Sequence, residues 1–191
     1  LSDLIYTGNI GSDTTLYIRG YYAPNNGGTF DFNIGTKNFN VEVIRPWLEG
    51  IATNISGRMS GKLNLFGTPS QPVITGRLRF SRTGLKIDYT KVDYTFADYI
   101  VLEKNAILFD DFTINDYKGN RLYITGALRH NHFQDFRMDL NLDFKNLNVL
   151  RTNSMDNSSF YGMINTTGNL KLKGLLDKMY LTAGIATTEG T

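Results

Sequence analysis

The chain has 191 residues, 20 Lys and Arg against 18 Asp and Glu, a net charge of +2 and no cysteine. Its basic residues are spread along the sequence, which excludes the clustered basic face of a nucleic-acid-binding protein, and no apolar run approaches the ~20 residues that a membrane span needs. Nineteen glycines, four prolines and 13% aromatic residues are typical of many short strands joined by turns.

The first strands are expected over residues 1–42. Residues 4–10 and 14–22 have the pattern of a β-hairpin, because apolar and polar side chains alternate on both sides of a Gly-Ser-Asp turn. A loop follows at 24–28, where Pro, Asn and Gly gather. Residues 30–34 then predict one more short strand.

Residues 43–52 interrupt the alternation and predict one short amphipathic helix that lies against the apolar surface of the sheet. Pro46 is compatible with this helix only in its first turn. The alternative is an irregular loop with a buried Trp47. The helix prediction rests on apolar residues at helical spacing, namely Ile44, Trp47, Leu48 and Ile51.

Residues 55–191 indicate repeated β-hairpins, a pattern typical of an extended, stacked array. The repeat occurs at 57–80, 121–144 and 162–187, each time as a glycine-containing alternating strand, a polar turn and a second alternating strand. Glycine weakens a strand, so glycines on the apolar face mark a bend or a close approach of backbones. They stand at positions 61, 76, 126 and 168, and shorter strands are expected at 85–90, 92–96, 99–103 and 106–109.

The clearest hairpin runs from Arg121 to Phe144, because on both sides of its turn the even positions are apolar or glycine and the odd positions are mostly polar. If the two residue numbers of each pair add up to 264, then Leu128 faces Phe136, Ile124 faces Leu140 and Leu122 faces Leu142. The same register sets Arg129 against Asp135 and Arg121 against Asp143, and each such pair contributes about 0.2–1 kcal/mol.

Nearly every predicted strand has one apolar face, and a single helix cannot cover them all. The face is buried either by closure into a sandwich, solenoid or barrel, or by curvature of the sheet around an apolar groove that serves as a binding surface. The groove hypothesis assigns an apolar ligand to Met59, Leu63, Leu65, Ile74, Leu78, Phe80, Leu122, Ile124, Leu128, Phe136, Met138, Leu140, Leu142, Phe144, Ile164, Leu170 and Leu172.

The order and spacing of several motifs resemble the C-terminal part of the TamB family, within the wider AsmA-like group, from residue 55 onward. These motifs are the turn and return at 65–76, the run at 115–128 and the glycines at 162, 168, 174 and 190. The resemblance implies an all-β, elongated and curved antiparallel or mixed sheet, a taco-like half-pipe with an apolar concave interior.

The family resemblance also implies a function. TamB-like proteins are translocation and assembly module subunits of the Gram-negative envelope, anchored in the inner membrane and crossing the periplasm. Their expected partners are phospholipids or nascent outer-membrane β-strands, and an outer-membrane barrel related to BamA. The anchor is expected outside this chain, because both ends read as cut from a longer protein. The alternative is a closed β-solenoid or sandwich that acts as a structural or adhesin module.

No constellation of residues predicts catalysis, so we expect a non-enzyme without cofactor or metal. His130 and His132, with Asp135 nearby, are expected on a solvated turn without convergent partners. Asp110, Asp111 and Asp116 have no spacing of a calcium loop and are expected at a turn and a strand edge.

Overall fold

The structure is a computed structural model that describes residues 2–9, 15–25, 27–156, 161–175 and 178–190. Within these residues the chain forms one antiparallel sheet of twelve strands and one short 3-10 helix, which confirms the predicted all-β class. The elements are β1 Ser2–Asn9, β2 Thr15–Ala23, β3 Thr29–Asn40, η1 Val41–Trp47, β4 Ala52–Thr68, β5 Gln71–Ile87, β6 Asp93–Phe96, β7 Tyr99–Glu103, β8 Ala106–Asp116, β9 Arg121–Asn131, β10 Gln134–Thr152, β11 Gly162–Leu175 and β12 Lys178–Gly190.

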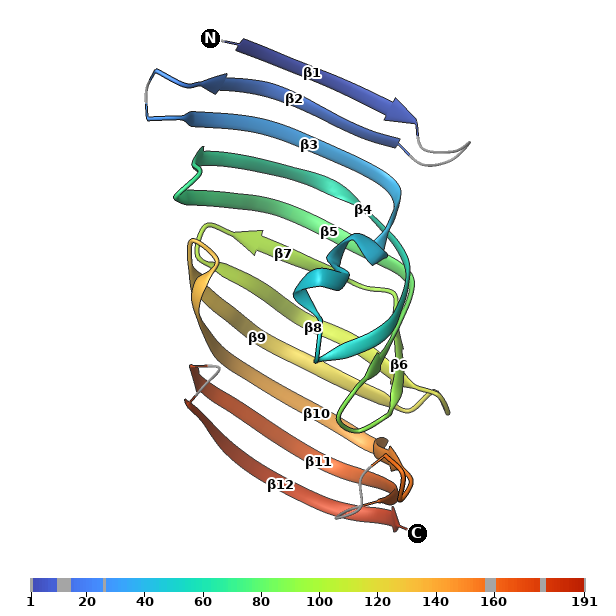
Figure 1. Ribbon diagram of the computed structural model, residues 1–191. Coiled ribbons are helices and arrows are strands. Elements are labelled where there is room, and N and C mark those ends of the chain that lie inside the picture. The colour runs from blue at the N-terminus through green and yellow to red at the C-terminus, as the bar shows by residue number, and fades with distance from the viewer. Residues whose placement is uncertain (1, 10–14, 26, 157–160, 176–177, 191) are drawn as a thin grey trace.

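Neighbours in the sequence are neighbours in the sheet, as a series of hairpins requires. The order runs β1-β2-β3-β4-β5-β6-β8-β9-β10-β11-β12, and β7 pairs with β5 and β8 beside β6 (Figure 1). The sheet is open, because β1 and β12 stand at opposite ends of this order. It is therefore neither a closed sandwich nor a closed solenoid.

Two strands differ from the predictions between residues 80 and 116. The expected strand at 85–90 belongs to the end of β5 and stops at Ile87, and the expected strand at 106–109 continues as β8 to Asp116. The strands at 92–96 and 99–103 correspond to β6 and β7, which share the space between β5 and β8.

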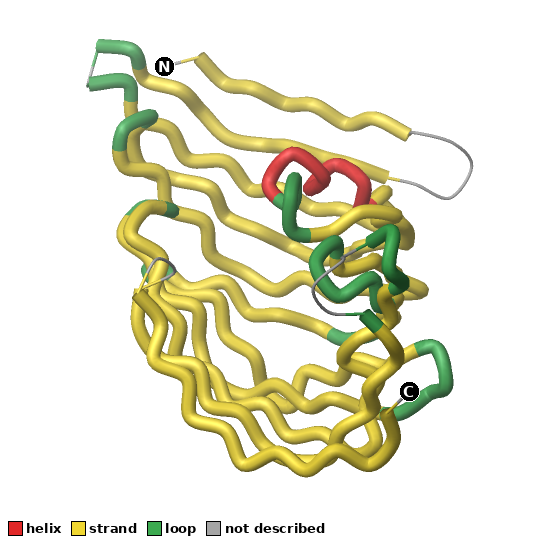
Figure 2. Tube along the Cα trace, turned by 60° about the horizontal axis from the view of Figure 1, so that its bottom comes forward, coloured by secondary structure: helices red, strands yellow, loops and turns green. Residues whose placement is uncertain are grey.

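Bulges bend the long strands. The pairing shifts between Thr36 and Phe39 in β3, and similar shifts occur in β4, β8 and β10. An extra residue in one strand of a pair increases the local twist and bends that strand. Figure 2 shows the strands bending along their length so that the sheet forms a trough, a shape compatible with the expected half-pipe. At one bulge in each of these four strands an Asn or Asp has positive φ, namely Asn38, Asn54, Asp111 and Asn146.

Helix η1 begins earlier and ends earlier than the predicted 43–52. Asn40 caps it, since its Oδ1 accepts a hydrogen bond from the backbone N–H of Glu42 at 3.0 Å. Pro46 lies in the last turn instead of the first. The prediction that the helix packs on the apolar sheet surface is confirmed, because Val41 is fully buried against Ile55, Phe80 and Phe112.

The predicted register of the β9–β10 hairpin is wrong by two residues, although its two faces are right. Leu128 faces Met138 and Ile124 faces Leu142, so paired residues sum to 266 instead of 264. Half of the difference arises at the turn, where Gln134 pairs with Asn131, and half at a bulge between Gln134 and Arg137; the sequence pattern reveals neither. Because a shift of two preserves the face, the apolar set stays together. The predicted pair of Arg129 with Asp135 is replaced by Arg129 opposite Arg137.

In the part of the chain that the structure describes, every helix is too short or too polar to cross a bilayer.

Candidate functional site

The candidate site is the inner face of the sheet, defined here as the face on which η1 lies. A row of directly paired residues crosses it from β3 to β11 without a charged side chain. Every side chain in this row other than glycine is half-buried. In order, the row is Ile34, Leu63, Gly76, Leu102, Ile107, Leu128, Met138 and Gly174.

A parallel row runs two residues further along the strands, because alternate side chains of a strand share a face. Phe109 is opposite Gly126, which is opposite Leu140, and Leu140 is opposite Leu172. The pairing of alternating strands therefore converts a pattern along the sequence into a continuous apolar surface across the sheet.

All seventeen residues that the groove hypothesis names lie on strands of this sheet, and none is exposed. Three of them are buried, Phe80 and Leu122 with 8% of their surface exposed and Phe144 with 9%. The other fourteen are half-buried, namely Met59, Leu63, Leu65, Ile74, Leu78, Ile124, Leu128, Phe136, Met138, Leu140, Leu142, Ile164, Leu170 and Leu172.

Two clusters fill part of the inner face. In the first, η1 covers Phe80 and Phe112, with Met59 and Ile124 packed at its border. In the second, Leu122, Phe144 and Leu147 are packed together with Leu142 and Leu170 at the border. Ten half-buried groove residues belong to neither cluster, and below they are called the uncovered part of the inner face: Leu63, Leu65, Ile74, Leu78, Leu128, Phe136, Met138, Leu140, Ile164 and Leu172.

A recess of about 280 Å³ opens between the two clusters. It is lined by Leu85, Ile87, Tyr94, Phe96, Ile114 and Leu122. Of these six, the groove hypothesis names Leu122 alone. The missed residues come from the end of β5 and from β6 and β8, where the predicted strands were short. Their signal was present, because Leu85 with Ile87 and Tyr94 with Phe96 each alternate at a spacing of two.

A buried polar network closes one end of the site beside the second cluster. Asp116 is 3% exposed, and its carboxylate accepts hydrogen bonds from the backbone N–H of Lys118, Asn120 and Asn148 and from the Asn120 side chain. Burial raises the pKa of Asp116, but these hydrogen bonds together outweigh burial and hold the pKa below its ordinary value of 3.8. Asp116 thus stands at the end of β8 beside a turn, as expected, and is also the centre of a buried network.

Tyr94 joins the recess to this network. Its hydroxyl donates to the carbonyl oxygen of Asn148 at 2.8 Å. Burial, and then the negative charge of Asp116, raise the pKa of Tyr94 well above its ordinary value. The tyrosine is therefore a neutral hydrogen-bond donor whose ring lines the recess.

His130 is not on a solvated turn, as the sequence analysis expected, but is 6% exposed. Its ring stacks on Phe133 at 4.4 Å between centroids, and its Nδ1 accepts a hydrogen bond from the backbone N–H of Phe133. The Nδ1 atom of His132 lies 3.1 Å from the carbonyl oxygen of Pro72. The His132 ring thus joins the β9–β10 turn to β5, and the His130 ring packs within the hairpin. Among the described residues no group of three or more His, Asp and Glu is placed to hold a metal.

His130 is expected to make stability depend on pH. Burial, and then repulsion from His132, hold the pKa of His130 below its ordinary value of 6.5. The unfolded chain therefore takes up a proton first, so stability is full above about pH 6.5 and falls as the pH drops toward the folded pKa. We expect His130→Gln to flatten this slope in urea unfolding between about pH 7 and pH 5. An unchanged slope in the variant would contradict the assignment.

In a comparison with protein families, residues 110–191 match the TamB C-terminal domain. The matched segment begins within β8 and includes β9 to β12, and it confirms the resemblance noted from the sequence over these residues, whereas the motif at 65–76 lies outside the match. No curated protein and no solved structure matches the chain. A TamB C-terminal domain implies a protein of the cell envelope.

Proposed function

We propose that this chain is a periplasmic segment of a TamB-like protein, anchored in the inner membrane by a part outside this sequence. Its inner face provides a hydrophobic groove for phospholipid transfer between the inner and outer membranes, for assembly of outer-membrane proteins, or for both. The observation that carries the proposal is the uncovered part of the inner face, whose apolar side chains continue from strand to strand.

The physical basis is the hydrophobic effect. Each CH2 group that an acyl chain buries on this face contributes about 0.8 kcal/mol. The contact is non-directional, so an acyl chain can slide along the rows without breaking specific bonds. The apolar face of a nascent outer-membrane β-strand meets the same surface chemistry. A BamA-like barrel is the proposed acceptor at the outer membrane, and the groove acts by binding and guiding instead of by catalysis.

The first test is native mass spectrometry of the purified chain, which is expected to show bound phospholipid. Replacing Met138 and Leu140 with Asp places two carboxylates in the uncovered part, where both side chains are half-buried. Because an unpaired charge resists contact with an acyl chain, we expect retention of a fluorescent phospholipid to fall at least about tenfold.

Asn141→Asp is the matched control, because it adds a carboxylate to the same strand on the opposite face. It is expected to bind lipid as the parent does. Circular dichroism checks that each variant is folded, and Met138→Asn with Leu140→Gln replaces the Asp pair if that pair unfolds. Unchanged lipid binding in a folded variant, or unfolding of both variants as for a packed core, would refute the groove.

A further inference from the structure

Two basic side chains lie directly opposite each other on the outer face, the face away from η1. Lys62 of β4 pairs with Arg77 of β5, and one step along the same strands Ser60 pairs with Arg79. The three basic side chains are exposed. Like charges in directly opposite positions destabilise a sheet. The arrangement therefore has a cost that neighbouring acidic residues would be expected to relieve.

Acidic residues do not relieve it. Among the described residues, ion pairs within 4.0 Å join Arg45 to Glu42 and Lys118 to Glu189. Neither pair includes Lys62, Arg77 or Arg79. The acidic residue of β3 is Asp31, whose Oδ1 accepts a hydrogen bond from the Asn64 side chain at 2.7 Å.

Asp98 contributes a carboxylate to the same surface, but its oxygens are already engaged. One accepts a hydrogen bond from the backbone N–H of Tyr99 at 2.8 Å and the other from that of Thr113 at 3.0 Å. With three cations and one carboxylate, the surface carries a net charge of +2. The charge is thus left for a ligand.

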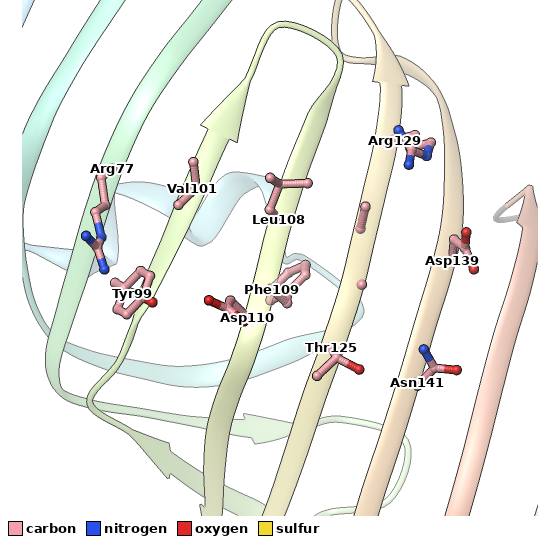
Figure 3. Close-up of a pocket in the computed structure, with 12 residues that line it drawn as sticks. Arg77, Tyr99, Val101, Leu108, Phe109, Asp110, Thr125, Arg129, Asp139 and Asn141 are labelled. Carbon is pink, nitrogen blue, oxygen red and sulfur yellow. The ribbon is translucent and has the colours of Figure 1, made fainter.

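Arg77 is held in place by an aromatic ring. Its guanidinium carbon lies 3.5 Å above the centre of the Tyr99 ring, and Figure 3 shows the two side chains together with Asp110 beyond Tyr99. A stacked guanidinium uses its flat face for the ring and keeps its N–H groups, which lie in the plane, free to donate. The side chain is therefore ordered before any ligand arrives.

These groups surround a hollow of about 690 Å³ on the outer face, lined by Ser60, Lys62, Arg77, Arg79, Asp98 and Tyr99 among others. We propose that this hollow binds a phosphate group. Opposite side chains on paired strands are about 4.5–5.5 Å apart at Cβ, so one tetrahedral anion can accept hydrogen bonds from both strands at once. Arginine and lysine are the side chains that recognise phosphate, and hydroxyl donors such as Ser60 complement them.

In the test, the 191-residue protein is titrated with inorganic phosphate as the probe, and binding is monitored by NMR. Saturable shifts are expected for the backbone amides around Lys62 and Arg77. In the double variant Lys62→Ser and Arg79→Ser, phosphate affinity is expected to fall at least about tenfold. The melting temperature is expected to stay equal or rise, because the substitution removes the facing like charges.

The control is Lys171→Ser with Lys173→Ser, which removes the same charge from exposed positions on β11. It is expected to bind phosphate as the parent does. Flotation with vesicles of phosphatidylglycerol in phosphatidylcholine separates the two sources of phosphate. Flotation lost in the Lys62/Arg79 variant identifies a lipid headgroup, and absence of flotation with intact phosphate binding identifies a free phosphate ester. Absence of saturable binding, or an equal loss in the Lys171/Lys173 control, would overturn the proposal.

Discussion

Replacing Gly76 with alanine is expected to lower the free energy of unfolding by about 3 kcal/mol or more. Gly76 has φ +138°, a region that other residues rarely adopt, and an added Cβ would collide with the carbonyl oxygen of Lys62 on β4. Relief would require β4 and β5 to separate, and these strands pair over most of their length. The steric cost therefore cannot be avoided by moving a side chain.

Gly84→Ala, in the same strand, is the matched control for this prediction. Its added Cβ would lie 3.4 Å from Ser56 Oγ, an ordinary contact, and its φ lies outside the left-handed region. We expect this variant to change the free energy of unfolding by less than about 1 kcal/mol. Alanine also reduces the conformational entropy of the unfolded chain, which acts to raise stability. Urea unfolding followed by circular dichroism measures both, and equal losses would show that the close approach at Gly76 is unimportant.

The second large effect is expected for Asp116→Ala, at about 3 kcal/mol or more. The substitution leaves the backbone N–H groups of Lys118, Asn120 and Asn148 without their acceptor. The backbone N–H of Asn148 is buried, because Asn148 is 0% exposed. A buried donor without a partner lowers stability by the full free energy of its desolvation. The same method of urea unfolding measures the loss.

Asp110→Ala serves as the comparison, because it makes the same change on β8 at an exposed position. It is expected to change stability by less than about 0.5 kcal/mol. A comparable loss in the two variants would mean that the network around Asp116 contributes little.

Asp116 also predicts an acid-dependent loss of stability. Its folded pKa is lowered, so its contribution is present above about pH 4 and is lost as the pH falls through the folded value. Asp116→Asn lacks this ionisation, and we expect its stability to fall less steeply between about pH 5 and pH 2. Parallel curves for parent and variant would contradict the lowered pKa.

The sequence predicted the two faces of the sheet because a period of two runs through the long strands between their bulges. It also predicted a bend or a close backbone approach at four glycines, and each of them would place a Cβ against a carbonyl oxygen of a neighbouring strand: Gly61, Gly76, Gly126 and Gly168. Register was not predictable in the same way. The turn and a bulge near Asp135, with φ 50°, each move the pairing by one residue, and no side-chain pattern marks either.

The candidate site was predictable in outline, and the boundary between its filled and uncovered parts was not. Phe80 and Phe144 have the same alternation as Leu63 and Met138, yet the first two are buried in clusters. This difference in burial arises from tertiary effects, because η1 covers part of the sheet and bulges fold one region of the sheet over another. Val41, the fully buried residue of η1, lay outside the helix predicted for 43–52.

The bulges in β3, β4, β8 and β10 mean that curvature is encoded within individual strands and not by closure of the whole sheet. A hairpin that carries its own bend can be inserted or removed without altering the width of its neighbours. The length and the width of the trough are consequently independent in this architecture, so a longer or shorter trough of the same width is obtained by changing the number of hairpins alone.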